Sequence, residues 1–129
     1  MGEINMMNDI NLSRANFEKL GKQYKEANGV RIQKEIIEDV DCYWFNSAEQ
    51  SHNKKIIIYL HGGCFVLGSI HSHKALVSHL AQATKIPILF IEYSLAPEKP
   101  FPKAINEIIQ VYQKLTSDLT THDFIFMGE

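Results

Sequence analysis

A glycine-rich stretch at the end of an apolar segment holds the first residues that could do chemistry. Residues 59–68 read YLHGGCFVLG, so a run of β-forming residues stops at His61 and is followed by Gly62, Gly63 and Cys64. Backbone this free of side chains can form a tight turn, cradle a phosphate, or aim N–H groups at the negative oxygen that develops when an acyl carbon is attacked. The neighbouring residues distinguish these three functions.

The phosphate-binding alternative lacks the residues that its chemistry needs. Gly63 and Gly68 have the spacing of a Walker loop, but that motif continues with Lys and then Ser or Thr, whereas this chain continues with Ser69 and Ile70. The G-x-G-x-x-G pattern of dinucleotide-binding loops is absent from the sequence. A structural turn and an oxyanion hole are left, and glycines suit an oxyanion hole because side chains would block the approach of the substrate.

Apolar strands and amphipathic helices alternate around this stretch. The predicted strands are residues 55–60, 86–93 and 124–127, and the predicted helices run from about 72 to 84 and from about 103 onward. This order predicts an α/β fold with a mostly parallel sheet and flanking helices. His61 and the two glycines after it would then lie at the carboxyl end of a strand, where sheets of this kind place their chemistry.

The N-terminal part of the sequence predicts a helix and a pair of short strands. Apolar residues recur at helical spacing between Ser13, a candidate N-cap, and Asn28–Gly29, a candidate C-cap. Residues 31–37 and 40–45 are rich in β-branched and aromatic residues and are separated by two residues only, as in a hairpin. We expect one partial domain over 1–129, in which about 1–29 form a helical segment and about 30–129 form the first strands and helices of the sheet.

Composition and charge limit the partners and the location of the chain. Of its 129 residues 45% are apolar, and 13 basic against 15 acidic side chains give a net charge of −2, with no long block of either sign. We therefore expect no nucleic-acid partner, and no apolar run approaches the roughly 18 residues of a membrane span. Cys42 and Cys64, without a signal peptide, indicate a reduced, cytoplasmic protein. The sequence carries no signature of its oligomeric state.

Three closely spaced histidines suggest a metal site, but their positions oppose it. A zinc site needs three or four converging ligands. His71 and His73 lie where a loop becomes a helix, and His79 follows about a turn and a half later, so the three side chains would not readily face one ion. We expect a solvated helix start here, and neither a metal ion nor a cofactor.

Two longer motifs decide between the turn and the oxyanion hole. The run HGGCFVLGS and, some two dozen residues later, EYSLAPEKPFPKA closely resemble the HGGG and D-Y-R-L-A-P-E-x-P-F-P-A signatures of the hormone-sensitive lipase family of α/β-hydrolase esterases. The resemblance implies that the N–H groups of Gly63 and Cys64 are the oxyanion-hole donors, that Gly62 allows the bend, and that His61 is the motif histidine. Cys64 stands in place of the third glycine, keeping the amide but adding a side chain.

The second motif departs from the family at two positions. Glu92 stands for the usual Asp, and Ser94 stands for the usual Arg, so we expect weaker support of this loop. We interpret Glu98 as structural. Cys64 could itself be a nucleophile, but no histidine is fixed beside it in the sequence, and a small loop residue is the favoured interpretation.

The same resemblance implies that the catalytic triad lies beyond residue 129. In the family the strand that matches residues 124–127 leads into G-[DE]-S-A-G-G, and Gly128–Glu129 match the approach to that serine. We therefore expect no nucleophile, acid or base in this chain, which would be inactive alone, with the edge of its last strand exposed.

The intact parent would be a serine carboxylesterase or lipase acting on small or medium acyl esters, its N-terminal helix part of a lid. The alternative is a non-catalytic, truncated α/β module that acts as a binding or interaction protein.

Overall fold

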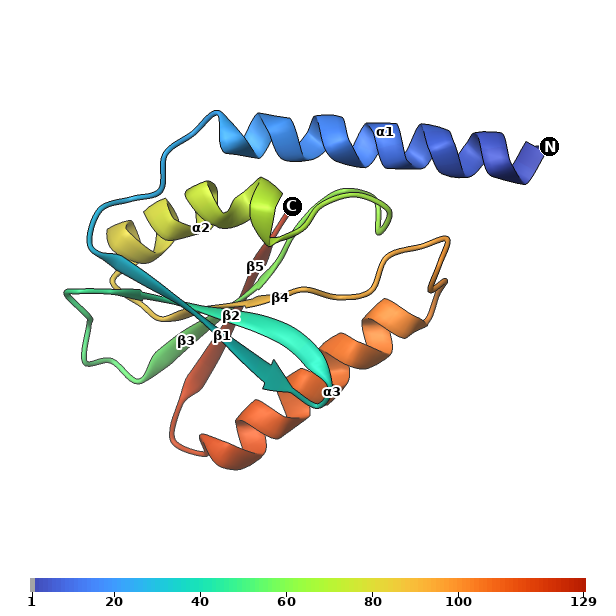
Figure 1. The fold of residues 1–129 in the computed structure, drawn as a ribbon. Helices are drawn as coiled ribbons and strands as arrows, with labels where there is room; N and C mark the ends of the chain where they lie inside the picture. Colours follow the sequence, from blue (N-terminus) through green and yellow to red (C-terminus); the bar gives the residue numbers. More distant parts are fainter. Residues whose placement is uncertain (1) are drawn as a thin grey trace.

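A twisted five-stranded sheet lies at the centre of the structure, a computed structural model that describes residues 2–129 (Figure 1). The strands are β1 (Val30–Ile37), β2 (Val40–Ser47), β3 (Lys55–Leu60), β4 (Ile88–Ile91) and β5 (Asp123–Gly128), in the spatial order β1-β2-β4-β3-β5. β3, β4 and β5 are parallel, whereas β1 pairs antiparallel with β2 and β2 pairs antiparallel with β4. The predicted α/β fold with a mostly parallel sheet is confirmed.

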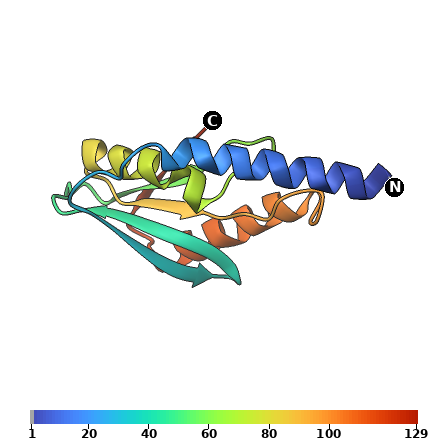
Figure 2. The ribbon, with the colours of Figure 1, turned by 45° about the horizontal axis from the view of Figure 1, so that its top comes forward.

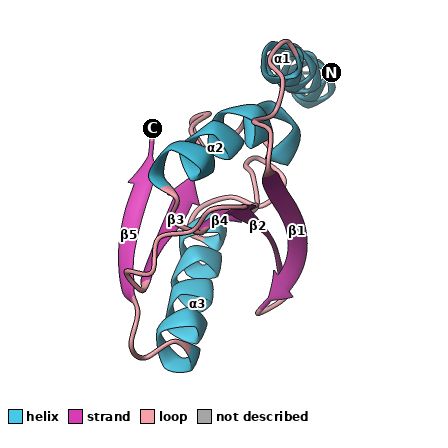
Figure 3. Ribbon diagram, turned by 90° about the vertical axis from the view of Figure 1, so that its left-hand side faces the viewer, coloured by secondary structure: helices cyan, strands magenta, loops and turns pink. Residues whose placement is uncertain are grey.

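Helices cover both faces of this sheet. They are α1 (Gly2–Lys22), α2 (Ile70–Thr84) and α3 (Lys103–Asp118). α2 packs on one face and α3 on the other, and α1 lies against the outer side of α2 (Figure 3). Figure 2 shows that α1 runs along α2 and continues past the sheet, so its N-terminal half has little beneath it.

The central strand β3 is buried on both faces, as its uniformly apolar sequence predicts. Ile57 and Tyr59 pack with α2, in the cluster that contains Val77, while Ile58 packs with α3, in the cluster that contains Val111. Side chains that alternate along a strand thus reach two separate cores. Because β3, β4 and β5 are parallel, their carboxyl ends meet at one edge of the sheet, which brings residues 61–68 beside the end of β5.

Local sequence signals explain most of the element boundaries. Glu38 and Asp39 form the predicted two-residue turn, and both have positive φ (51° and 63°), as a type I′ hairpin turn requires. α2 begins at Ile70, slightly before the predicted start, because Ser69 caps it and forms a capping box with Ser72. β4 begins two residues after the predicted start, since Pro87 cannot donate to the sheet ladder, and it ends at Ile91, two residues before the predicted end.

The predicted limits of the N-terminal helix are wrong at both ends. α1 covers Gly2–Lys22, and none of its residues is buried, so no apolar stripe marks its extent. It also ends before Asn28–Gly29, because residues 23–28 leave the helix to dock on α2. There Ala27 is buried and its N–H donates a 2.8 Å hydrogen bond to the Ser78 hydroxyl. A tertiary contact therefore ends the helix, where the sequence suggested a glycine cap.

The helices of residues 2–129 are too short or too polar to cross a lipid bilayer.

Candidate active site

The loop that follows β3 folds back on itself in a tight turn. The Val66 and Leu67 N–H groups both donate to the Gly63 carbonyl, at 3.0 and 2.8 Å. Gly63 has φ +127°, and a Cβ at this position would lie 2.3 Å from the Leu67 carbonyl oxygen, so only glycine fits. Cys64 and Phe65 follow with φ of 56° and 58°, both in the left-handed region. The turn needs glycine at Gly63 and bends the chain across the end of β3.

The two amides proposed as oxyanion donors lie in this turn. Neither the Gly63 N–H nor the Cys64 N–H donates a backbone hydrogen bond within residues 2–129. Cys64 is exposed, and no histidine nitrogen of the described chain is hydrogen-bonded to its sulfur, so nothing in the structure activates it as a nucleophile. A glycine would tolerate the left-handed φ at this position better than cysteine does.

His61 anchors the loop from inside the fold. Its ring is 3% exposed and stacks between Tyr93, at 4.3 Å and 7°, and Phe90, at 5.4 Å and 12°. Nδ1 lies 2.8 Å from the Gly62 carbonyl oxygen, and the Tyr93 hydroxyl donates to the His61 carbonyl. Burial lowers the pKa of His61 to about 4, despite the smaller opposing effect of the bond to Gly62. His61 is therefore a neutral packing residue at physiological pH.

His73 lies at the same edge, although the sequence suggested a solvated position for it. The side chain is 5% exposed, and Nε2 lies 2.6 Å from Oε1 of Glu129. Tyr59 donates from its hydroxyl to Oε2 of Glu129, at 2.7 Å. Burial acts to raise the pKa of Glu129, but the hydrogen bonds from Tyr59 and His73 outweigh it and hold the pKa below its usual value. The end of β5 is thus tied to β3 and α2.

The other two histidines of the group are exposed, as predicted. His71 makes no side-chain hydrogen bond within the described chain, and His79 bonds only the Lys25 carbonyl, at 3.0 Å. No group of three or more His, Cys, Asp or Glu side chains in residues 2–129 is arranged to hold a metal ion. The prediction of a solvated helix start was wrong for His73 alone.

Ser72, His73 and Glu129 form a line of hydroxyl, imidazole and carboxylate that is not a catalytic triad. Ser72 Oγ lies 2.8 Å from His73 Nδ1, but it also accepts from the Ser69 N–H and donates to the Ser69 carbonyl, both at 2.9 Å. Its backbone is covered by α1, where a Cβ on Gly21 would lie 2.1 Å from the Ser72 carbonyl oxygen. The hydroxyl is committed to capping α2 and does not act as a nucleophile.

Arg14 joins the N-terminal helix to both sequence motifs. Its guanidinium donates to the Val66 carbonyl at 2.8 Å and to the Ala96 carbonyl at 2.9 Å, and binds Glu98 with two bonds of 2.5 and 2.9 Å. These bonds lower the pKa of Glu98 to about 2. The structural role assigned to Glu98 is consistent with this contact, and Arg14 is a residue that sequence reasoning missed.

The second motif is hydrogen-bonded to α3 through Ser94. Where the family has Arg, Ser94 donates from its N–H and its hydroxyl to Glu107, at 2.7 and 2.9 Å. Glu107 lies on α3 and is buried. Both oxygens of one buried carboxylate thus hold this loop, one through the backbone and one through the Ser94 hydroxyl.

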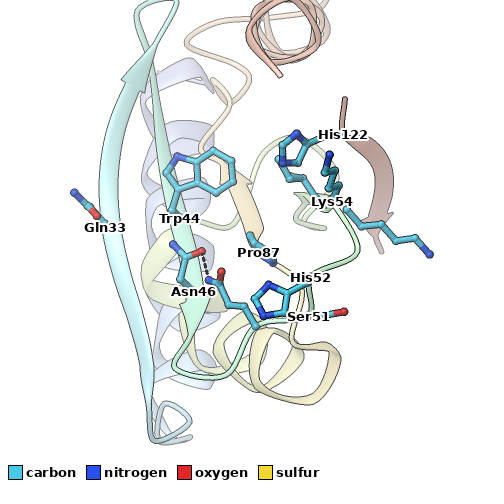
Figure 4. A pocket seen from close by; sticks show the side chains of 11 residues that line it. Gln33, Trp44, Asn46, Ser51, His52, Lys54, Pro87 and His122 are labelled. Carbon is cyan, nitrogen blue, oxygen red and sulfur yellow. Dashed lines mark hydrogen bonds between the residues drawn. The ribbon is translucent and has the colours of Figure 1, made fainter. Parts of the chain in front are cut away.

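A separate cavity of about 590 Å³ opens at the opposite end of the parallel strands from residues 61–68. Figure 4 shows Trp44 and Asn46 of β2 together with His52, Lys54 and His122 from the loops that precede β3 and β5. These residues lie where the parallel strands begin, whereas residues 61–68 lie where they end. The cavity is therefore not part of the candidate active site.

Comparison with known proteins places this geometry in a family. The model of a family described as alpha/beta hydrolase fold matches residues 57–129, more than half of the chain. The chain belongs to the alpha/beta hydrolase fold family. The matched residues include both motifs, the loop after β3, and β5.

Relatives within the alpha/beta hydrolase fold family confirm the resemblance to hormone-sensitive lipases. An esterase from Acinetobacter venetianus is 40% identical over 81 residues, which are 62% of this chain and 27% of that esterase. Human hormone-sensitive lipase is 38% identical over 69 residues, 54% of this chain and 6% of that protein. The crystal structure of an esterase/lipase from an uncultured bacterium superimposes with a TM-score of 0.81 at 27% identity, over 93% of this chain and 40% of that one. This chain therefore spans less than half of the length of each of these relatives.

Proposed function

We propose that this chain is the N-terminal part of a serine carboxylic-ester hydrolase that acts on small or medium acyl esters. The observation that carries the proposal is the turn at the carboxyl end of β3, where the Gly63 and Cys64 N–H groups make no backbone hydrogen bond within residues 2–129. Donors that are fixed in position and free of partners suit an oxyanion that exists only during the reaction. The relatives, which are esterases and lipases, support the same assignment.

In this proposal the nucleophile comes from residues outside the 129. A serine hydroxyl attacks the ester carbonyl carbon while a histidine takes its proton, and the carbonyl oxygen becomes negative. The N–H groups of Gly63 and Cys64 donate to that oxygen. The intermediate then expels the alcohol, which receives the proton from histidine, and water releases the acid in a second, similar step. No metal ion or cofactor takes part in this mechanism.

The register of the sheet supports the position of the nucleophile. β3 and β5 are paired so that Leu60 lies opposite Gly128. A Cβ on Gly62 would lie 2.5 Å from Cγ of Glu129, so the end of β5 touches the loop directly. A serine that follows Glu129 would begin beside the proposed donors.

The hydrogen bonds of Arg14 to both motifs support a lid role for the N-terminal helix. An apolar cavity of about 800 Å³ lies between α1 and α2, with Phe17, Leu20 and Leu76 in its walls. We assign to α1 a part in covering the acyl side of the site. The proposal also includes a cytoplasmic location, supported by Cys42 and Cys64 being free thiols.

Ester hydrolysis by the full-length polypeptide tests the proposal. We expect it to hydrolyse p-nitrophenyl acetate, and expect replacement of the serine after Glu129 by alanine to lower kcat by about a million-fold. The 129-residue chain alone should show no turnover above that alanine variant. Activity that survives the replacement would show that the roles are assigned wrongly.

The alternative of a non-catalytic binding module has one observation in its favour. β5 lies at the edge of the sheet, and Phe126 is 51% exposed there. An intact-mass measurement of the natural protein separates the two functions. A folded species of 129 residues that captures a partner through β5 would favour the module, whereas a species of more than twice that mass that hydrolyses esters would exclude it.

A further inference from the structure

His73 contacts the two parts of the candidate site that must be held at a fixed separation. Its Nε2 binds the carboxylate of Glu129, at the end of β5, and its ring lies 5.2 Å from the ring of His61, which begins the loop with the proposed donors. These two residues belong to different strand ends and are 68 positions apart in the chain. The proposed mechanism gives His73 no role, although the residue is buried and both of its ring nitrogens have partners.

The surroundings of the imidazole fix its position. Nδ1 is engaged by the Ser72 hydroxyl at 2.8 Å and Nε2 by Glu129 at 2.6 Å, so both ring nitrogens have partners. Aromatic rings surround it, with Phe17 at 5.8 Å and Phe90 at 6.3 Å between ring centres. The side chain leaves α2 within its first turn, directly after the capping box of Ser69. A ring held by two hydrogen bonds and several flat neighbours has little freedom to shift.

The carboxylate that His73 binds is itself held at both oxygens. Tyr59 of β3 donates to Oε2 of Glu129, and His73 of α2 is paired with Oε1. The two contacts fix the Glu129 side chain against the strand that carries the loop and against the helix that follows it. Through this carboxylate, Tyr59 and His73 restrain the position of the end of β5 relative to β3 and α2.

We propose that His73 is a positioning residue, which sets the distance between the nucleophile that follows Glu129 and the N–H donors of Gly63 and Cys64. This inference rests on the proposed function. His73 touches no substrate atom and moves no proton in the reaction. It acts through Glu129 on one side and through His61 on the other, and a misplacement of about 1 Å between nucleophile and donors is enough to cost about 100-fold in rate.

The test compares three substitutions in the full-length enzyme. His73→Leu fills a similar volume but removes both ring nitrogens, and we expect kcat to fall by about 10- to 100-fold while KM changes by less than about twofold. His73→Gln places an amide N–H where Nε2 stood and should restore kcat to within about threefold of the wild type. His71→Leu removes an exposed histidine from the same helix and should leave both constants unchanged.

A double-mutant cycle distinguishes an effect transmitted through Glu129 from a general loss of stability. Tyr59→Phe removes the other donor to Glu129, and we expect its effect on kcat to be non-additive with that of His73→Leu, because both act through one carboxylate. All assays are run well below the unfolding temperature of each variant, measured by circular dichroism.

The outcomes separate this inference from the function on which it rests. If the wild-type protein does not hydrolyse esters, the proposed function fails. If the wild type is active and His73→Leu, folded at the assay temperature, keeps kcat within twofold, His73 is not a positioning residue. An equal loss of kcat in His73→Leu and His73→Gln would also contradict the positioning role of His73, since the hydrogen bond to Glu129 would then not affect the rate.

Discussion

The loop after β3 and the helix α1 both border the candidate site, but they are held in opposite ways. The loop is fixed from within by His61, whose ring is 3% exposed and stacked between two aromatic rings. α1 contributes no buried residue and is joined to both motifs by hydrogen bonds of Arg14 and, at Ser69, by one of Glu18. We therefore expect α1, which buries no side chain, to open locally more readily than the donor loop.

Replacing His61 by alanine should have the largest effect. The substitution leaves a cavity between Phe90 and Tyr93 and removes the bond to the Gly62 carbonyl, so we expect the free energy of unfolding to fall by about 3 kcal/mol. Urea denaturation followed by circular dichroism measures it. If the free energy of unfolding fell by less than about 1 kcal/mol, the His61 ring would not anchor the loop. The loop and α1 would then not differ in how they are held.

The same residue should make stability depend on pH. The pKa of His61 is about 4 in the folded chain against 6.5 for an unperturbed histidine, so between these values the unfolded chain binds a proton that the folded chain does not. The contribution of neutral His61 to the free energy of unfolding is complete above about pH 6.5. As the pH falls from there towards 4, this contribution decreases by about 1.4 kcal/mol per pH unit.

Urea midpoints measured between pH 7 and pH 4.5 check this dependence. In His61→Phe, which keeps a flat ring without a titrating group, the slope over this interval should be reduced by about one proton. An unchanged slope in that variant would assign the pH dependence to other groups.

Arg14→Met should have a smaller and local effect. Methionine keeps an apolar stem but loses the bonds to Val66, Ala96 and Glu98, and because the pair with Glu98 is partly exposed we expect at most about 1 kcal/mol in global stability. Hydrogen exchange of α1 amides should accelerate, while that of β3 amides should not. Faster exchange in both elements would contradict the independence of the two regions.

Cys64→Gly should have the smallest effect. Cys64 has φ 56°, so glycine relieves the left-handed conformation but gains freedom in the unfolded chain, and we expect a net stabilisation of no more than about 1 kcal/mol. Lys85→Gly, at a left-handed helix cap with φ 59°, is the matched control away from the site. A loss of stability in the first variant with a gain in the second would mean that the Cys64 side chain makes contacts that matter.

Local patterns predicted the sheet and two of its helices because neighbouring residues determine them. The apolar run of β3 and the two-residue turn at Glu38–Asp39 are each readable from a few adjacent residues. The limits of α1 were not, since its end is set by Ala27 docking on Ser78, 51 positions away. The apolar spacing after Ser13 indicated a helix, but α1 buries none of its residues, so no apolar stripe in the sequence marks where it begins.

The candidate site divides in the same way between local and distant contacts. The loop residues His61 to Cys64 were found from their own motif, but the contacts of Arg14 span 52 to 84 positions and no local pattern announces them. His73 did leave a signal, because it falls on the stripe of Ile70, Val77 and Ala81, all buried in α2. That spacing would have placed it facing the sheet.

The reach of Arg14 has a consequence for synthesis on the ribosome. Its acceptors, the carbonyls of Val66 and Ala96, lie 52 and 82 positions further along, so both are made after the whole of α1. The complete set of Arg14 contacts can therefore form only after Glu98, 84 positions further along, has been added to the chain. In a nascent chain paused before Glu98, α1 would be held by fewer contacts, and we expect proteases to cleave it more readily there.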